Sequence, residues 1–230
     1  MQERTQSSIP FVGLHAHSGT GSPFDGLGYP GEHMDFAYQN GNDALALTDH
    51  GNMNGFAYQV QHAQKMMKEG RNFKPIFGVE AYFLPSIEEW RLELDRVKED
   101  KKAKKSIDKS SSGTTIEDEG NKREVKNILN RRRHLILLAQ NQKGLNNIFS
   151  LVSKSYREEN FYRFPRIDYA MLKEHNEGVI AASACLGGVY AGNFWENKEE
   201  GEEAVLNAMR DTTRNMVGIF GDRWYGELQW

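Results

Sequence analysis

The sequence contains a single cysteine, Cys185, among its 230 residues. One thiol cannot form a disulfide within the chain, so a disulfide framework is excluded and the composition is typical of a reducing compartment. The sequence also lacks an uninterrupted apolar run of about 18 residues, the length that spans a membrane. Its start, Met-Gln-Glu-Arg-Thr-Gln-Ser-Ser, has no apolar segment of the signal-peptide kind. We therefore expect a soluble, cytoplasmic protein.

An excess of charge of either sign is also missing. The 29 lysines and arginines and the 32 aspartates and glutamates leave a formal net charge of -3. This excludes nucleic-acid binding through bulk positive charge, so any DNA contact would be local or supplied by residues outside this chain. The length is enough for one large domain or two small ones, and a single barrel-like domain of alternating strands and helices fits it.

The sequence does contain an alternation of short apolar strands and amphipathic helices, which predicts an α/β fold. We expect the third strand to be interrupted around Gly78. In such folds the carboxyl ends of the strands share one face, which holds the active site. The predicted strands cover residues 11–17, 44–48, 73–83, 134–139, 178–182 and 222–230, and the predicted helices cover residues 29–39, 55–69, 143–155, 167–175 and 198–217.

Two segments differ from this pattern. Residues 88–131 are dense in mixed charge and poor in apolar side chains, which predicts an insertion that is mobile or partly helical. Its lysines are more simply explained as a solvated surface than as a DNA phosphate contact. Residues 156–165 interleave aromatic and basic side chains, which suits either stacking on single-stranded bases or a loop packed on the rim of the domain. We favour the packed loop.

Two histidines follow the first apolar run. In an extended strand, residues i and i+2 point to the same face, so His15 and His17 aim two imidazoles at one point. This arrangement is typical of metal ligands, although a pair of histidines alone is as readily explained by surface or core positions.

Further residues of the metal-ligand type lie at the edges of the predicted strands. Each lies at or just beyond the end of an apolar run except His134, which begins its run. The other histidines, His33, His62 and His175, fall in or near predicted helices and are left out. The complete set is His15, His17, Asp25, His50, Glu80, His134 and Cys185.

The chemistry of this set predicts a polynuclear metal site. Imidazole, carboxylate and thiolate together suit zinc, manganese or iron better than calcium or magnesium. Seven ligands exceed what one ion needs, so we expect two or three divalent ions bridged by a carboxylate, for which Glu80 is the candidate. Such ions are suited to phosphoester hydrolysis. We assign catalytic roles to Glu80 and to Asp49, which is expected to orient an imidazole beside His50.

Several longer motifs accompany these residues. Phe-Val-Gly-Leu-His-Ala-His-Ser (11–18), Leu-Thr-Asp-His-Gly (47–51) and Pro-Ile-Phe-Gly-Val-Glu (75–80) resemble the first three motifs of the polymerase and histidinol phosphatase (PHP) superfamily. Residues 51–55, 134–147, 165–167 and 177–188 are similar, more narrowly, to the PHP domain that opens the alpha subunit of bacterial DNA polymerase III. The resemblance covers nearly the whole chain apart from the insertion, and a bacterial or a phage source is compatible with it.

The resemblance implies a distorted (β/α)7 barrel with a trinuclear metal site. In several family members this site is a 3′–5′ exonuclease, whereas in others its ligands are degraded and the domain is structural. Every family ligand position that this chain reaches carries a competent residue, which favours the active class. By position, the resemblance implies one ion held by His15, His17 and Glu80, a second held by Glu80, His134 and Cys185, and a third held partly by Asp25 and His50.

The family's last motif, an Asn-Asp-x-His segment, is expected beyond Trp230. We therefore interpret residues 1–230 as the N-terminal part of a PHP domain truncated before its last strand and helix elements, with polymerase domains downstream. The expected partners are a DNA 3′ end or primer-template, the remaining polymerase domains, and a proofreading subunit or sliding clamp in the parent complex. The fragment alone is expected to be a poor nuclease.

Three functions stay open from the sequence. The first is the PHP domain of a replicative DNA polymerase, which would hydrolyse phosphodiesters at DNA 3′ ends while the parent protein synthesises DNA. The second is a free-standing phosphatase of the histidinol-phosphate kind, which is disfavoured because residues 134–188 follow the polymerase version. The third is a non-catalytic scaffold that supports a polymerase or docks a proofreading subunit.

Overall fold

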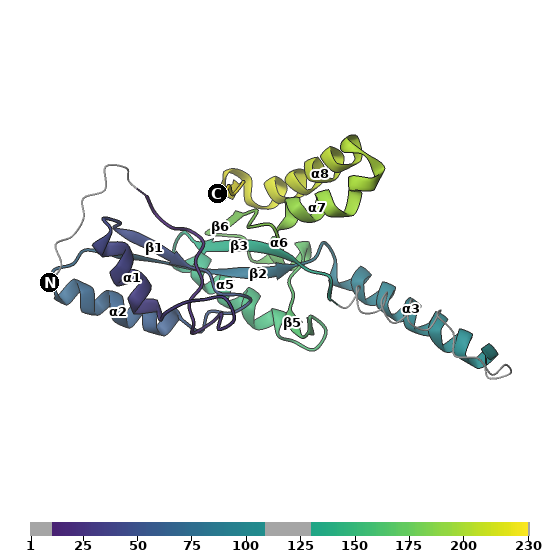
Figure 1. Cartoon of the computed structure of the whole chain (residues 1–230), viewed down its shortest axis with the longest axis horizontal. Helices are drawn as coiled ribbons and strands as arrows, with labels where there is room; N and C mark the ends of the chain where they lie inside the picture. The colour runs from purple at the N-terminus through teal and green to yellow at the C-terminus, as the bar shows by residue number, and fades with distance from the viewer. Residues whose placement is uncertain (1–10, 109–129, 230) are drawn as a thin grey trace.

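The computed structural model describes residues 11–108 and 130–229 (Figure 1). Its centre is a five-stranded sheet of order β1-β2-β3-β6-β7. Neighbouring strands pair in parallel for β1 with β2 and β6 with β7, whereas β3 pairs antiparallel with both β2 and β6. The strands are β1 (Ala44–Leu47), β2 (Lys74–Phe83), β3 (Arg133–Ala139), β6 (Val179–Ala182) and β7 (Trp224–Tyr225).

The reversed direction of β3 explains why its histidine begins the strand. Antiparallel pairing brings the first residues of β3 to the edge where the other strands of the sheet end. His134 pairs with Tyr82 near the end of β2 and bridges Gly188, which follows β6. His134 therefore reaches the same edge as the residues that follow the other strands.

The first predicted strand is only partly formed. Within residues 11–17, Gly13 makes an isolated parallel bridge with Leu45. The backbone N–H groups of Ala46 and Thr48 donate to the carbonyl oxygens of Gly13 and Ala16 at 2.8 Å each. The segment therefore lies extended along the outer edge of β1 without becoming a strand of the sheet.

The prediction that Gly78 interrupts the third strand is wrong, because β2 is continuous through it. β2 instead changes its pairing here, since residues 74–77 pair with β1 and residues 78–83 pair with β3. A Cβ at Gly78 would lie 2.6 Å from the carbonyl oxygen of Leu137. The close approach of β3 therefore requires glycine at this position.

Helices cover one face of the sheet. The main core packs Val79, Leu135 and Leu137 of the sheet against α5, α6 and α8. A second core packs α1 and α2 against β1. The helices are α1 (Pro30–Gln39), α2 (Phe56–Lys68), α3 (Ile87–Asp108), α5 (Gln142–Ser155), α6 (Tyr169–Glu174), α7 (Val189–Asn197) and α8 (Glu202–Phe220), with 3-10 turns at Lys198–Glu200 and Gly221–Arg223.

The opposite face of the sheet carries Glu80. Side chains alternate along a strand, so Glu80 of β2 lies on the same face as Ile136 and Leu138 of β3. The small cluster that includes Ile136 and Leu138 is built from strand residues and Ala184, and no residue of a described helix belongs to it. The α/β fold is confirmed, and its closure into a (β/α)7 barrel stays a prediction.

The predicted insertion begins as a helix. α3 projects from the body of the molecule (Figure 1). Four residues at helical spacing, Ile87, Trp90, Leu94 and Val97, are buried in a cluster with Tyr162 and Met171. The first turns of α3 are therefore packed rather than solvated. Residues 109–129 of the predicted insertion lie outside the described residues.

The aromatic segment at residues 156–165 forms a hairpin of β4 (Phe161–Tyr162) and β5 (Phe164–Pro165). Arg166 is fully buried and donates hydrogen bonds to the carbonyl oxygens of Tyr162 and Phe164 at 2.9 Å each. These contacts favour the packed loop over a base-stacking surface.

The C-terminal part differs more from the prediction. The helix α7 was not predicted, α8 begins and ends later than the predicted helix, and the last strand is confined to β7. None of the helices in the described part of the chain is both long and apolar enough to cross a membrane.

Candidate metal centre

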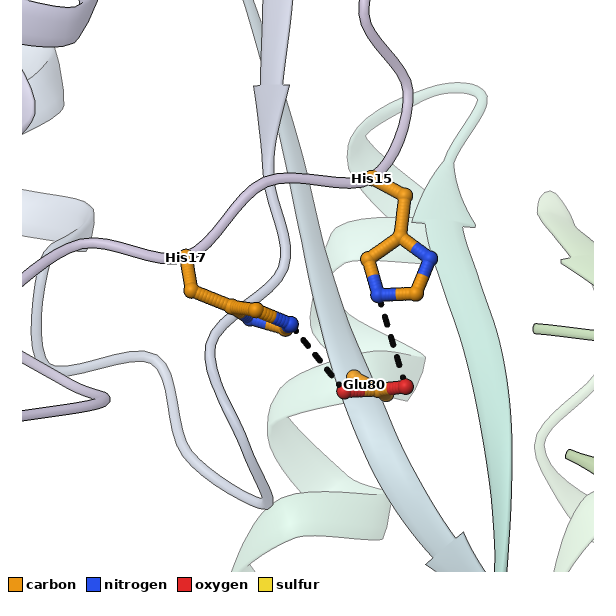
Figure 2. Close-up of side chains that lie close together, drawn as sticks. All are labelled: His15, His17 and Glu80. Carbon is orange, nitrogen blue, oxygen red and sulfur yellow. Dashed lines mark ion pairs between the residues drawn. The ribbon is translucent and has the colours of Figure 1, made fainter. Parts of the chain in front are cut away.

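The carboxylate of Glu80 lies fully buried among four imidazoles. Its Oε1 is 2.9 Å from Nδ1 of His134 and 3.4 Å from Nε2 of His15. Its Oε2 is 2.7 Å from Nδ1 of His50 and 3.3 Å from Nε2 of His17. Figure 2 shows how His15 and His17 reach Glu80 from the extended first segment.

The backbone explains why these side chains meet. His50 lies three residues beyond β1 and forms a parallel bridge with Glu80, so β1 is effectively prolonged along β2 at this point. The N–H of Gly51 donates to the carbonyl oxygen of Glu80 at 2.8 Å, and the N–H of Glu80 donates to that of Asp49 at 3.1 Å. Strand pairing therefore places His50 directly beside the carboxylate of Glu80.

The remaining two predicted ligands complete the cluster. The Sγ atom of Cys185 lies 3.7 Å from Oε1 of Glu80 and 3.6 Å from Nδ1 of His134. Oδ2 of Asp25 lies 2.7 Å from Nε2 of His50. The structure thus brings all seven predicted site residues together around one buried carboxylate.

The cluster fits divalent cations. In each of three overlapping groups of side chains, one ligand atom per residue lies within 4.8 Å of the others. Nδ1 of His50 and Oε2 of Glu80 are buried and lie 2.7 Å apart. A carboxylate oxygen and an imidazole nitrogen that converge in this way can both serve as ligands of one cation. The groups are His15, His17 and Glu80; His17, Asp25 and His50; and His50, Glu80 and His134.

The contacts between the ligand-type side chains shift their pKa values. Burial would lower the pKa of His15, but its contacts with Glu227 and Glu80 outweigh burial and raise that pKa to about 10. Burial likewise opposes the contacts with Cys185 and Glu80 that raise the pKa of His134 to about 9. Burial would raise the pKa of Glu80, yet hydrogen bonds from His134 and His15 hold it far below its usual range. The hydrogen bond with His134 lowers the pKa of the Cys185 thiol.

These shifts predict a pH dependence of metal binding. At pH 7, a pKa of about 10 for His15 and about 9 for His134 keeps both imidazoles protonated in the metal-free protein. An imidazole must lose its proton at the nitrogen that binds the metal, so loading the site with Mn²⁺ at pH 7 should release at least the protons of His15 and His134, and the apparent affinity should rise with pH.

Calorimetric titration with Mn²⁺ in two buffers of different ionisation enthalpy counts the released protons. Measurement at several values between pH 6.5 and 8.5 gives the trend in affinity. Binding without proton release, or an affinity that does not change over this range, would contradict the assignment of His15 and His134 as ligands.

Asp49 has a different role from the predicted one. Its carboxylate does not contact an imidazole, because its two oxygens accept hydrogen bonds from the N–H and Oγ of Ser18 at 2.6 and 2.8 Å and from Oγ of Ser22 at 3.0 Å. Ser22 Oγ in turn accepts from the N–H of His50 at 3.0 Å. Asp49 therefore fixes the loop that leads to Asp25, and the expectation that it orients an imidazole is wrong.

A carboxylate that the sequence interpretation missed also contacts the cluster. Oε1 of Glu227 lies 2.7 Å from Nδ1 of His15, and Gln229 donates to the same oxygen at 2.7 Å. The N–H of Glu227 donates to Oγ of Ser183 at 2.9 Å, which ties this segment to the end of β6. Glu227 lies just beyond β7, the last strand of the sheet. The other candidate ligands also lie at or beyond strand ends, so its position in the sequence could have identified it.

The excluded histidines lie in other surroundings. Nε2 of His62 is 2.9 Å from Asp35, and Nε2 of His175 is 3.6 Å from Glu174. The ring of His33 contacts the carbonyl oxygen of Leu27. None of the three belongs to the ligand groups found in the described residues.

The family model and the curated relatives that match this chain point to one family. Residues 13–229 match the PHP domain family. The DNA polymerase III subunit alpha of Aquifex aeolicus is 35% identical over 222 residues, which are 96% of this chain and 16% of that protein. That of Treponema pallidum is 34% identical over 223 residues, 96% of this chain and 15% of that protein. The chain thus spans about a sixth of the length of these curated relatives.

Solved structures give a weaker match. A two-domain protein from Bacteroides vulgatus, described as containing a predicted PHP-like metal-dependent phosphoesterase, is 24% identical, with 37% of this chain and 28% of that chain covered. Its TM-score is 0.29. A superposition at this level does not establish a common fold.

Proposed function

The chain belongs to the PHP domain family, and from this premise we propose that it hydrolyses phosphodiester bonds at a polynuclear metal centre. The observation that carries the proposal is the buried carboxylate of Glu80 in contact with four imidazoles. A buried carboxylate with two separate sets of nitrogen donors around its two oxygens is suited to bridging two cations. Paired divalent ions are the apparatus of metal-assisted phosphoester hydrolysis.

The residues of the chain have distinct roles in this proposal. Divalent ions, when bound, would lower the pKa of a water and neutralise negative charge that develops on the phosphate. The mixture of nitrogen, oxygen and sulfur donors favours zinc, manganese or iron. The ligand sets are His15, His17 and Glu80 for one ion, Glu80, His134 and Cys185 for a second, and Asp25 and His50 for part of a third.

Glu227 contacts the ligand set from outside it, through His15. A carboxylate that accepts a hydrogen bond from the outer nitrogen of a ligating histidine fixes the tautomer and the orientation of the ring. With Nδ1 of His15 engaged by Glu227, its Nε2 is the nitrogen that faces Glu80. Glu227 is therefore a positioning residue for His15.

We also propose that the sheet belongs to a (β/α)7 barrel whose interior is the face that carries Glu80. Two observations support this. The packed helices lie against the other face, as they would outside a barrel. Ile76, Ile180 and Ala182 are only partly buried on the Glu80 face, which is consistent with further strands packing there.

The names of the relatives suggest the context of the reaction. We propose that the chain is the PHP domain of a DNA polymerase III alpha subunit, a cytoplasmic enzyme whose other domains synthesise DNA. The proposed substrate is the 3′ end of DNA, from which 3′–5′ exonuclease action removes nucleotides. The proposed partners are the other polymerase domains and, in the parent complex, a sliding clamp or a proofreading subunit.

The proposal is tested with the full-length protein that contains this chain, stripped of metal and reloaded with Mn²⁺ or Zn²⁺. We expect metal-dependent shortening of a 5′-labelled single-stranded oligonucleotide from its 3′ end. An oligonucleotide with 3′-terminal phosphorothioate linkages is the matched control and should be shortened more slowly. A fully metal-loaded protein that cleaves neither substrate would contradict the proposal, and hydrolysis of histidinol phosphate alone would favour a phosphatase.

A further inference from the structure

Three consecutive arginines precede the metal-centre residue His134, and the structure separates them. Arg131 forms a bidentate ion pair with Glu93, at 2.6 and 3.0 Å. Arg133 pairs with Glu196. Arg132, between them, makes no ion pair with any described residue. Two of the three positive charges are therefore paired with carboxylates, and the middle one has no such partner in the described part of the chain.

The surroundings of the three side chains explain this difference. Arg131 and Arg133 line one cavity together with Glu93 and Glu196. Arg132 instead lies against the ring of Tyr82, which pairs with His134 across β2 and β3. The cluster of Glu80 also lies on the side of His134. The unpaired guanidinium is thus on the side of the sheet that holds the metal centre.

Aromatic rings hold Arg132 beside the cluster. Its Cζ lies 3.8 Å from the ring centroid of Phe164 and 5.3 Å from that of Tyr82. The Tyr82 ring is parallel to the His50 ring within 3°, at a centroid separation of 5.9 Å, and lies 5.3 Å from the His134 ring. The Tyr82 ring therefore lies beside both the guanidinium and two imidazoles of the candidate metal centre.

The donors of this guanidinium are only partly used. One Nη group donates to the carbonyl oxygen of Asn130 at 2.9 Å. The Nε atom is buried and has no hydrogen-bond partner among the described residues. A planar guanidinium that is held in place, makes no ion pair with a described residue and retains an Nη group without a hydrogen bond to one is suited to binding a phosphate oxygen.

We propose that Arg132 binds a non-bridging phosphate oxygen of the phosphoester held at the metal centre. This inference rests on the proposed function and adds a substrate-binding residue to it. The flanking arginines are unsuited to this role because both are already paired with glutamates. The ligand class is a phosphodiester or a phosphomonoester, which Arg132 recognises through its charge and its N–H donors.

The experiment compares Arg132→Gln with Arg131→Gln, which removes the same charge one residue away. Binding of inorganic phosphate to the Mn²⁺-loaded protein is measured by calorimetry, and KM and kcat are measured on the single-stranded oligonucleotide. We expect Arg132→Gln to raise both the phosphate Kd and KM by roughly 10- to 100-fold, the usual value of a hydrogen bond to a charged group. The metal content should stay close to that of the unsubstituted protein.

The controls separate binding from folding. Arg131→Gln should change the phosphate Kd less than about threefold, the scale of an exposed ion pair. Arg132→Lys, which keeps the charge, should restore part of the affinity. Unchanged phosphate binding in Arg132→Gln, an equal loss in Arg131→Gln, or no phosphate binding by the unsubstituted protein would overturn the inference. Loss of phosphate binding in Arg132→Gln, when the unsubstituted protein binds phosphate but cleaves no DNA, would support it and count against the proposed function.

Discussion

Replacement of Glu80 by glutamine is expected to abolish tight metal binding. The carboxylate contacts four imidazoles and belongs to two of the three candidate ligand groups, so its loss would affect at least two of the proposed ions. Glutamine keeps the size but supplies one neutral oxygen. The affinity for Zn²⁺ or Mn²⁺ should fall by more than the roughly 10- to 100-fold loss that follows removal of an outer partner of a ligand. Metal content after dialysis, measured by elemental analysis, and chelator competition provide the test.

The matched control is Glu227→Gln. It removes a carboxylate that also contacts His15 but lies behind it, so the expected loss of affinity is only roughly 10- to 100-fold, with the metal stoichiometry retained at saturation. The decisive outcome is which variant loses more metal affinity, and we expect the larger loss in Glu80→Gln. A Glu80→Gln protein that retains the same number of ions with the same affinity would contradict a bridging role for Glu80.

Replacement of Asp49 by alanine is expected to destabilise the fold by about 2 to 4 kcal/mol, because buried donors lose their acceptor. Asp49 is 3% exposed, and its carboxylate accepts from the buried Ser18 and Ser22. The carboxylate is closely packed, since a Cβ added at Gly21 would lie 2.4 Å from Oδ2 of Asp49. Urea unfolding of the metal-free protein measures the change.

Asp25→Ala is the comparison for this variant. The Asp25 side chain is 51% exposed and contacts the His50 imidazole, so its removal should change the free energy of unfolding by less than about 1 kcal/mol while weakening metal binding. If Asp49→Ala changes the stability only slightly and loses as much metal as Asp25→Ala, the result would instead favour the original prediction that Asp49 contacts an imidazole.

The candidate site was largely predictable because its residues follow apolar runs that are easily read from the sequence. His15, His50 and Glu80 lie at or beyond such runs, and strand pairing then brings them together. The role of Asp49 was not predictable, since the sequence neighbour of a ligand can point to the opposite side of the backbone. The role proposed for Arg132 was not predicted, because three successive arginines resemble a solvated charge run until their ion-pair partners distinguish them.

The fold was predictable where local signals are strong. The helix α1 begins at Pro30, as expected from proline in its first turn. The direction of β3 was not predictable, because an alternating pattern of strands and helices usually indicates parallel pairing, whereas here the long connection through α3 returns the chain antiparallel. The helix α7 was missed because it starts directly after Gly187 and Gly188, a pair of residues typical of loops.

The most direct test of the polynuclear centre is the anomalous scattering of a crystal of the full-length protein loaded with Zn²⁺, measured on both sides of the zinc absorption edge. We predict at least two anomalous peaks on opposite sides of the Glu80 carboxylate, at about 2.0 to 2.3 Å from imidazole nitrogens and from Sγ of Cys185. Peaks confined to the surface of the protein, with none beside Glu80 under saturating zinc, would contradict the account.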